Sequence, residues 1–471
     1  MTPPSSRTPD LPPPVPLLSA VAPRLNPALA DAIRTLRRRA EAAVTTHRAA
    51  GVDSVRRIEC VVEGADPLGF LAAQPAGSRA FFRTRDGVTS VAMVGVAATF
   101  SHPDDPGFRR LLALEPAITA LLAGRFDNER EAGPEWRAFG PAQVIVPAVK
   151  LRRDAGRSSL VAILIGDGRA TLEAIDQLSM EEVPTDPHAV APEYEPGFGA
   201  GAGIDSSELA WMSAIRSTLA EIASGAVRKI VLARTRTFTL TAAADPCALL
   251  ARLGESEPGT YQFIVEPAPG VAFVGASPER LFRRTGLAFE SEAVAGTRPR
   301  GETPEADFAE ADALFRSDKD RREHSLVLDR IRDRLESVVQ SLRVARGPRL
   351  LRLARVQHLC TPVDAVLKTD VSDGELLARL HPTPAVCGQP AERARVIIRN
   401  CEPFDRGLYA GPIGLIGATT EVCVAIRSAL VIGQSVTAFA GAGIVAGSDA
   451  ALEWRETEHK LATIERLVRP A

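Results

Sequence analysis

Tyr261-Gln-Phe-Ile-Val-Glu266, Val271-Ala-Phe-Val-Gly-Ala276 and Arg280-Leu-Phe-Arg-Arg284 follow one another closely in the middle of the chain. Each run is short and rich in β-branched or aromatic residues, which is typical of β-strands. No helical pattern separates them, so this part of the chain does not show the regular alternation of strand and helix that a doubly wound sheet requires.

The same kind of pattern extends on both sides of these three strands. We expect further strands at residues 79–85, 88–96, 142–147, 159–165, 229–240, 413–416, 422–431 and 436–439. We expect helices at residues 27–50, 206–224 and 304–342, and from about 450 onwards. In the 304–342 block, apolar residues from Leu328 to Leu342 recur at helical spacing, and Asp449 is a suitable N-cap for the last helix. The sequence therefore predicts an antiparallel α+β fold.

The composition is that of a globular protein. The chain has 471 residues, of which 45% are hydrophobic and 24% charged, enough for one large domain or for two to three smaller ones. Its 56 basic and 58 acidic residues nearly cancel to a net charge of −2, which argues against a broad nucleic-acid surface. No apolar run reaches the roughly 18–20 residues that a membrane-spanning helix needs.

The cysteines indicate the cellular compartment of the protein, and the N-terminal residues indicate whether it carries a signal peptide. The six cysteines are scattered without a Cys-x-x-Cys pair, which argues against zinc and disulfide frameworks and favours a reducing cytoplasm. Closely spaced prolines would interrupt any signal peptide, so we interpret residues 1–20 as a disordered tail. The Pro- and Gly-rich stretch 183–205 is the best candidate for a linker.

Carboxylates stand at the start of two helices that lie far apart in the sequence. Glu323 lies in Ser317-Asp-Lys-Asp-Arg-Arg-Glu-His324, and Glu453, Glu456 and Lys460 project from one face of the last helix. One interpretation is ordinary solvated helix charge. The other is a magnesium site, because Mg²⁺ prefers oxygen ligands and often uses one or two carboxylates.

Two further residues can be general acids or bases. Lys229 shares a strand face with Val231 and Ala233, and its residue type alone favours a solvated sheet edge over a buried amine acting as a base. Glu279 follows Gly275-Ala-Ser-Pro, where an exposed turn carboxylate is the simpler interpretation. The alternative for Glu279 is a protonated carboxyl held in a pocket as a general acid.

Basic and glycine-rich segments are candidates for binding an anion. Ala295-Gly-Thr-Arg-Pro-Arg-Gly301 is either a carboxylate-binding loop or a basic surface loop. Arg427 is either a capping charge at a sheet edge or a bidentate carboxylate clamp. Phe439-Ala-Gly-Ala-Gly-Ile-Val445 lacks the Gly-x-Gly-x-x-Gly pattern of a dinucleotide site.

Together and in this order, eight segments resemble the chorismate-utilising enzymes, and within them the isochorismate synthases. The segments are Lys229-Ile-Val-Leu-Ala-Arg, Gly275-Ala-Ser-Pro-Glu, Ala295-Gly-Thr-Arg-Pro-Arg-Gly, Ser317-Asp-Lys-Asp-Arg-Arg-Glu-His, His381-Pro-Thr-Pro-Ala-Val-Cys-Gly, Glu402-Pro-Phe-Asp-Arg-Gly-Leu-Tyr, Phe439-Ala-Gly-Ala-Gly-Ile-Val and Glu453-Trp-Arg-Glu-Thr. The resemblance is dense from about residue 206 to residue 471 and loose in the first 200 residues.

The resemblance implies one large α+β domain of two packed antiparallel sheets with helices around them. Residues 21–204 would form its variable N-terminal half and residues 205–471 its motif-bearing catalytic core. The implied reaction is magnesium-dependent and reversible: water attacks C2 of chorismate while the C4 hydroxyl leaves, giving isochorismate. Supply to menaquinone, to a catechol siderophore or to salicylate made by a separate lyase is left open. From the size of the chain alone, we expect a monomer.

The resemblance also assigns roles by position. Lys229 corresponds to the base that activates water, and Glu279 to the acid that protonates the leaving hydroxyl. Glu323 and Glu456 correspond to magnesium ligands, with Glu453 acting through a water molecule. The positions that would bind substrate are Tyr409, Arg427, Gly441, Gly296, Thr297, Lys460 and Ala385.

Two positions favour one branch of the family. Members that use ammonia usually carry glutamine at the position of Lys229, and salicylate synthases typically carry threonine at that of Ala385. Both residues therefore favour a product that stops at isochorismate. A salicylate synthase, an anthranilate-type synthase component and a catalytically silent chorismate-binding protein remain the alternatives.

Overall fold

The computed structural model describes residues 24–47, 54–141, 143–183 and 207–468. The expected tail (1–20) and nearly all of the expected linker (183–205) lie outside these ranges. The helices are α1 (Pro27–His47), α2 (Pro67–Ala73), α3 (Pro106–Leu114), α4 (Arg169–Asp176), α5 (Glu208–Ala223), α6 (Pro246–Ser256), α7 (Pro304–Arg316), α8 (Asp318–Leu335), α9 (Asp373–Leu380), α10 (Ala391–Cys401) and α11 (Ala450–Val468), with the 3₁₀ helix η1 (Pro134–Phe139).

The strands of the N-terminal half are β1 (Arg24–Leu25), β2 (Val55–Val62), β3 (Arg79–Arg83), β4 (Thr89–Phe100), β5 (Thr119–Ala123), β6 (Val144–Asp154), β7 (Arg157–Ile165) and β8 (Glu181–Glu182). The remaining strands are β9 (Lys229–Thr239), β10 (Tyr261–Ala268), β11 (Val271–Ser277), β12 (Arg280–Thr285), β13 (Ala288–Pro299), β14 (Val339–Val344), β15 (Arg349–Arg352), β16 (Val356–Leu367), β17 (Gly388–Gln389), β18 (Pro412–Gly417), β19 (Thr419–Val424), β20 (Ser428–Ile432) and β21 (Ser435–Val445).

Antiparallel ladders connect nineteen of these strands, and β1 and β8 form a separate two-stranded ribbon. One series runs β2–β7–β6–β4–β3–β10–β11–β20–β21–β9–β17, and the other runs β5–β18–β19–β12–β13–β16, with β14 and β15 both paired to β16. The two series join at β6, where Val144 and Ile145 pair with β5. The predicted antiparallel α+β class is therefore confirmed, and its two sheets are continuous through β6.

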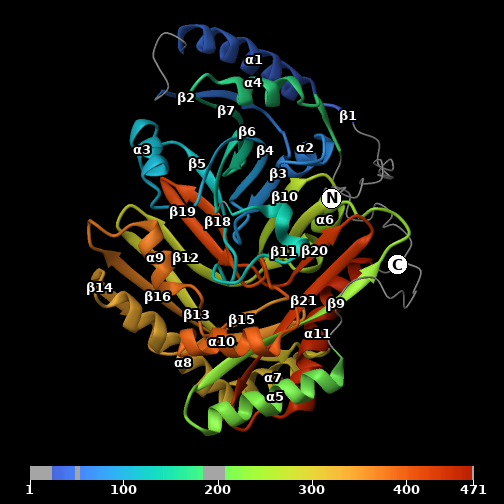
Figure 1. Cartoon of the computed structure of the whole chain (residues 1–471), viewed down its shortest axis with the longest axis vertical. Coiled ribbons are helices and arrows are strands. Elements are labelled where there is room, and N and C mark those ends of the chain that lie inside the picture. Colours follow the sequence, from blue (N-terminus) through green and yellow to red (C-terminus); the bar gives the residue numbers. More distant parts are fainter. Residues whose placement is uncertain (1–23, 48–53, 142, 184–206, 469–471) are drawn as a thin grey trace, which may run out of the picture.

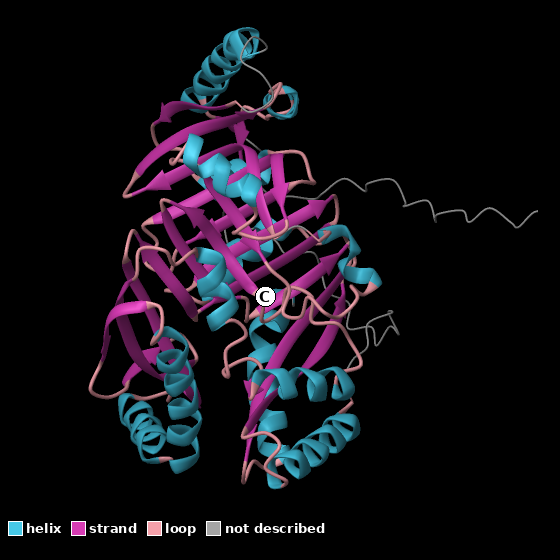
Figure 2. Cartoon of the chain, turned by 60° about the vertical axis from the view of Figure 1, so that its left-hand side comes forward, coloured by secondary structure: helices cyan, strands magenta, loops and turns pink. Residues whose placement is uncertain are grey.

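The two series of strands enclose one apolar core and the helices cover a second. Phe273 of β11, Phe282 of β12 and Ile413 of β18 belong to the first core, between the sheets. The second core lies between the longer series and helices such as α1, α6 and α11. Figures 1 and 2 show the strands in the middle of the molecule, with α1 and α4 at one end and α5, α7, α8, α10 and α11 at the other.

The N- and C-terminal parts of the chain are interleaved in the sheets. The ladder between β3 and β10 and the ladder between β5 and β18 join strands from the two sides of the expected 204/205 division. That division stays a prediction about sequence variability. In the described part of the chain, no helix combines the length and the apolar character that crossing a bilayer requires.

Two expectations about elements were wrong. The 304–342 block is two helices that meet at Ser317, whose hydroxyl caps α8, and the chain leaves the helix after Leu335 to form strand β14. Val339 and Leu342 fit the helical spacing, but β-branched residues and pairing with β16 favour a strand there. The 422–431 run is likewise two strands, β19 and β20, separated by residues 425–427.

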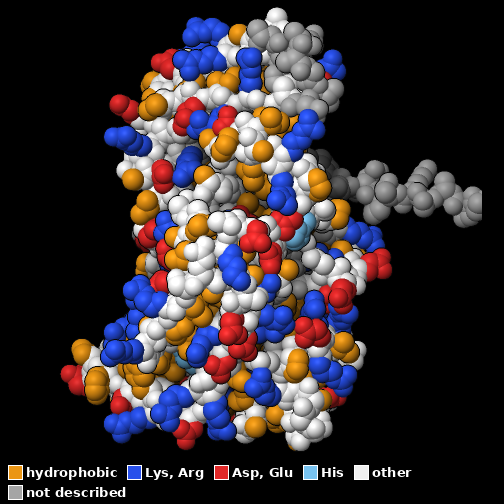
Figure 3. Space-filling model, turned by 90° about the vertical axis from the view of Figure 1, so that its left-hand side faces the viewer, with side chains coloured by type: hydrophobic (Ala, Val, Ile, Leu, Met, Phe, Trp, Pro, Cys, Tyr) orange, Lys and Arg blue, Asp and Glu red, His pale blue; other side chains and the backbone are white. Residues whose placement is uncertain are grey.

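Charged side chains of both signs are mixed on one face of the molecule (Figure 3). On the face shown in Figure 3, Lys and Arg side chains alternate with Asp and Glu side chains. This distribution fits the small net charge.

Candidate active site

A narrow cavity of about 90 Å³ brings together most of the residues predicted from the sequence. Its walls come from the strands β9, β13 and β21, from the turn before β20, and from the facing helices α8 and α11. The predicted residues in its lining are Glu279, Gly296, Thr297, Glu323, Ala385, Tyr409, Arg427, Gly441, Glu456 and Lys460.

Lys229 lies directly behind this lining and is fully buried. Its Nζ donates to Oε1 of Glu323 at 2.8 Å. A Cβ at Gly443, across the ladder, would lie 2.5 Å from that oxygen and 3.0 Å from Lys229 Cε, so glycine makes room for the contact. The solvated-edge interpretation of Lys229 was wrong because β9 is not an edge there: it pairs with β21 on one side and β17 on the other.

Glu279 is buried in the turn between β11 and β12, so the exposed-turn interpretation was also wrong. Burial, with a smaller contribution from the charge of Glu292, raises the pKa of this carboxyl to about 8 despite the opposing effect of Lys229. Glu279 is therefore largely protonated at neutral pH, the state that a general acid needs.

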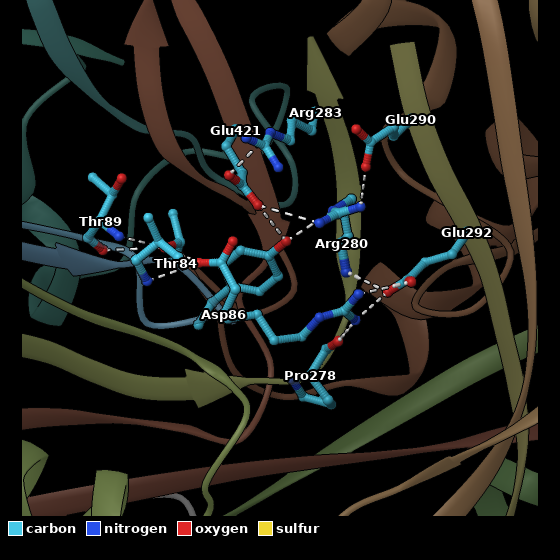
Figure 4. A network of polar contacts seen from close by, with 12 residues as sticks. Thr84, Asp86, Thr89, Pro278, Arg280, Arg283, Glu290, Glu292 and Glu421 are labelled. Atoms are coloured by element: carbon cyan, nitrogen blue, oxygen red, sulfur yellow. Dashed lines mark hydrogen bonds and ion pairs between the residues drawn. The ribbon is translucent and has the colours of Figure 1, made fainter. Parts of the chain in front are cut away.

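A polar network holds Glu292 beside that turn (Figure 4). Arg85 donates to Glu292 Oε1 at 2.5 Å and Oε2 at 3.0 Å, and to the carbonyl of Pro278 at 2.9 Å. The backbone N–H of Arg280 also donates to Glu292, at 3.3 Å. The network therefore positions the negative charge that adds to burial in keeping Glu279 protonated.

Each of the three carboxylates predicted to serve a metal is paired with a lysine. Besides the Lys229–Glu323 contact, Lys319 donates to Glu453 at 2.5 Å and Lys460 donates to Glu456 at 2.8 Å. The pKa of Lys319 is raised because all three carboxylates outweigh the effect of its burial.

The three carboxylates differ in their access to the cavity. Glu323 and Glu456 line it, whereas Glu453 is buried outside the lining, beside Lys319. Burial and neighbouring Glu456 raise the pKa of Glu453. For Glu456, Lys460 and Lys319 outweigh burial and the pKa is lowered.

The carboxylates of the site are oxygen donors of the kind that Mg²⁺ prefers. Across residues 24–47, 54–141, 143–183 and 207–468, no three His, Cys, Asp or Glu side chains form a preassembled metal site. The carboxylates of Glu323 and Glu456 nevertheless face one cavity from α8 and α11, and Mg²⁺ is commonly held by one or two carboxylates with substrate and water oxygens. The residues therefore fit a magnesium ion that shares its ligands with a bound anion.

Beside these carboxylates, the cavity also carries groups suited to an anionic substrate. Arg427 is buried with a left-handed φ of 53°, a backbone conformation that non-glycine residues rarely adopt. The Tyr409 ring stacks on Phe439 with centroids 5.1 Å apart, and Lys460 Nζ donates to the carbonyl of Gly441 at 2.8 Å. The lining of the cavity thus includes two cationic side chains and a phenol.

Sequence reasoning missed two buried residues that contact the site. Glu257 Oε2 lies 3.8 Å from Arg427 Nη1, and Nδ1 of His358 lies 3.1 Å from the carbonyl oxygen of Gly296. Burial lowers the pKa of His358 to about 3, so the ring is neutral, and its Nε2 is left as an acceptor without a partner in the described part of the chain. No motif or spacing marks either residue, because each reaches the site only through sheet pairing and helix packing.

A buried lysine and a protonated glutamate beside a carboxylate-lined cavity, carried on this pair of antiparallel sheets, define a chorismate-binding enzyme. The family model described as "Chorismate binding enzyme" matches residues 41–469, and the chain belongs to this family.

Particular relatives are isochorismate synthases. The chain is 36% identical to the chloroplastic isochorismate synthase of Catharanthus roseus, over 81% of this chain and 69% of the relative. It is 32% identical to isochorismate synthase MenF of Haemophilus influenzae, over 86% of this chain and 90% of that relative. The solved structure of MenF, the menaquinone-specific isochorismate synthase from Escherichia coli, superposes with a TM-score of 0.80 and 27% identity, covering 94% of this chain and all of that one.

Proposed function

We propose that the protein is an isochorismate synthase, an isomerase that converts chorismate reversibly into isochorismate. The observation that carries this proposal is the placement of a buried lysine, Lys229, and a buried protonated glutamate, Glu279, at one cavity. The names of the relatives point to the same reaction.

The reaction needs one proton taken and one proton given. Water adds to C2 of chorismate and the hydroxyl at C4 leaves. Lys229 accepts the proton of the attacking water, and Glu279 gives its proton to the departing hydroxyl. In the reverse direction the two residues exchange these roles, which is consistent with a reversible isomerisation.

We infer that magnesium assists this reaction and is held by Glu323 and Glu456, with Glu453 acting through a water molecule. When bound, the ion supplies positive charge that neutralises and orients the ring carboxylate of the substrate. Glu323 Oε1 accepts from Lys229 in the structure. If Glu323 held the ion, this contact would be free to break, and the amine of Lys229 would then be available to water.

Substrate binding also requires the cavity to widen. Sites for small molecules usually measure about 300–1,000 Å³, and this cavity has about 90 Å³. The contacts of Lys229 with Glu323 and of Lys460 with Glu456 are the ones we expect to open. Arg427, Tyr409 and the backbone at Gly441 then bind carboxylate oxygens, as do Gly296 and Thr297.

The alternatives within the family differ in their products. Lys229 supports water over ammonia as the nucleophile, and Ala385 in the cavity lining supports release of isochorismate over elimination of pyruvate to give salicylate. A chorismate-binding protein without catalytic activity would not need a protonated Glu279 as an acid. We further propose a cytoplasmic monomer, in keeping with six free cysteines of which five are buried.

The test is product analysis with the purified protein, chorismate and magnesium, with chelation by EDTA as the control. Isochorismate as the only product, lost on chelation, is the expected result. Salicylate with pyruvate would move the chain to the salicylate synthases, and an amino product formed only with ammonia would move it to the anthranilate type. No conversion would leave a chorismate-binding protein without this activity.

A further inference from the structure

A second and larger cavity lies outside the active site. Its volume is about 690 Å³, within the range of roughly 300–1,000 Å³ typical of small-molecule sites. It is enclosed by β4, β5, β6 and η1 and by the end of β10. Its walls are mainly apolar, with Met93, Leu121, Trp136 and Ile145 among them. Nothing in the proposed reaction uses this cavity.

The charged groups in its wall leave an excess of positive charge. Glu266 is neutralised by Arg79, whose Nη2 lies 2.6 Å from its carboxylate. Arg125 pairs with Asp405 at 2.5 Å, but its Nε is buried and has no hydrogen-bond partner among the residues described. Arg137 is exposed and makes no ion pair within the described chain. The cavity therefore suits an apolar molecule that carries one anionic group.

A layer two aromatic side chains thick separates this cavity from the active site. Trp136 lines the second cavity, and its ring lies 6.1 Å from that of Phe439, which lines the active-site cavity and stacks on Tyr409. Along the chain, Leu408 faces the second cavity and the adjacent Tyr409 faces the first.

Trp136 and the 405–409 segment cannot easily move independently of each other. The indole N–H of Trp136 donates to the carbonyl of Asp405 at 3.0 Å, and a Cβ at Gly407 would lie 2.0 Å from the Trp136 ring. Gly407 also has a φ of 54°, which disfavours any other residue. A displacement of Trp136 is therefore passed to the 405–409 segment, which carries Tyr409.

We propose that the second cavity is a regulatory site that binds an apolar small molecule with a single carboxylate or sulfonate group, and that its occupancy alters chorismate turnover through Trp136 and Tyr409. The proposal that this cavity binds a ligand depends only on the cavity itself. The regulatory part rests on the proposed function, because turnover of chorismate is its readout.

The binding test uses 8-anilinonaphthalene-1-sulfonate, a fluorescent aromatic anion, titrated into the full chain. We expect saturable binding that Ala132→Phe, which fills the cavity from a loop in its wall, abolishes. Arg137→Glu should weaken binding by roughly three- to tenfold, the effect of losing one charged contact at an exposed site. The matched control Arg38→Glu makes the same charge change on the exposed face of α1 and should leave binding unchanged.

Binding that neither cavity variant changes would overturn the proposal, as would binding that chorismate displaces competitively while both variants retain it. The regulatory test measures kcat and KM for chorismate at saturating probe. A change in either constant in the wild type that disappears in Ala132→Phe is expected. Unchanged constants despite binding would overturn the regulatory part. Absence of any turnover without probe would count against the proposed function and leave the binding result standing.

Discussion

At the scale of single residues, burial creates the chemistry of this site. Lys229 and Glu279 are ordinary polar residues on a strand and in a turn, and sheets and helices bury both of them. For Glu279, burial keeps the carboxyl protonated at neutral pH by raising its pKa to about 8. The buried Lys229–Glu323 contact places an amine and a carboxylate 2.8 Å apart beside a protonated Glu279. The proposed base, just behind the lining, thus lies at the same cavity as the proposed acid and a carboxylate suited to a cation.

The first prediction concerns the acid and the base. Lys229→Met and Glu279→Gln should each lower kcat by about 10²–10⁴-fold, since each removes one partner of a proton transfer. Product formation from chorismate is the measurement. Lys150→Met, at an equally buried lysine on β6, and Glu290→Gln, at a glutamate paired with Arg280, are the matched controls and should stay active. Wild-type rates in both site variants would remove these residues from the mechanism.

The second prediction concerns Glu257, which is a positioning residue in this arrangement. Oε2 of its carboxylate lies 3.8 Å from Nη1 of Arg427, within ion-pair distance of this buried guanidinium. Glu257→Gln should raise KM for chorismate by roughly tenfold, the cost of one weakened charged contact, and should change kcat much less. Steady-state kinetics separate the two constants. A fall in kcat at unchanged KM would contradict the positioning role.

At the scale of elements, two helices bring distant carboxylates to one place. Ser317 ends α7 and caps α8, so that Glu323 lies in the first turns of α8. Asp449 Oδ1 accepts from the N–H groups of Ala451 and Leu452 at the start of α11, which presents Glu456 and Lys460 on one face. The starts of both helices therefore determine where the carboxylates point.

The third prediction tests these carboxylates as magnesium ligands. Glu323→Gln and Glu456→Gln should each weaken apparent magnesium affinity by at least about tenfold, because each removes one charged oxygen donor from the cavity. Glu453→Gln should have a smaller effect, since Glu453 lies outside the lining and faces Lys319. Magnesium titration of activity, supported by calorimetry, is the measurement. If a variant shows the same magnesium titration as the wild type, the substituted residue is not a magnesium ligand.

At the scale of the whole molecule, the two sheets joined at β6 enclose the acid. Folding raises the pKa of Glu279 from 4.5 to about 8. Between these values the folded protein holds a proton that the unfolded chain releases. The stability associated with Glu279 is therefore fully present below about pH 4.5 and is lost as pH rises through about 8.

The fourth prediction follows from this decrease in stability with rising pH. The free energy of unfolding of the wild type should fall relative to that of Glu279→Gln by up to about 1.4 kcal/mol per pH unit between pH 5 and 8. Urea unfolding of both proteins at intervals of one pH unit measures the difference. Activity of the wild type should also decline above about pH 8, as the acid loses its proton. A difference in stability that does not change with pH would contradict a raised pKa.

Features that are set by residues close together in the sequence were predicted well. Helix α1 was expected at residues 27–50 and is described from Pro27 to His47, and the Asp449 cap was confirmed. Failures came where distant pairing competes with local pattern. Residues 339–344 form β14 because β16 lies beside them, and Arg427 interrupts an apolar run that looked like a single strand.

The sequence by itself determined the residue types of the site, the helix starts that carry its carboxylates and the order of motifs that identifies the family. These features depend on capping, on the alternation of side chains and on short spacings, which act over a few residues. Only the tertiary structure decided that Lys229 and Glu279 are buried, that Glu453 lies outside the cavity lining, and that Glu257 and His358 contact the site. Burial, pKa and ion pairing depend on which distant segments pack together, and no short stretch of sequence contains that information.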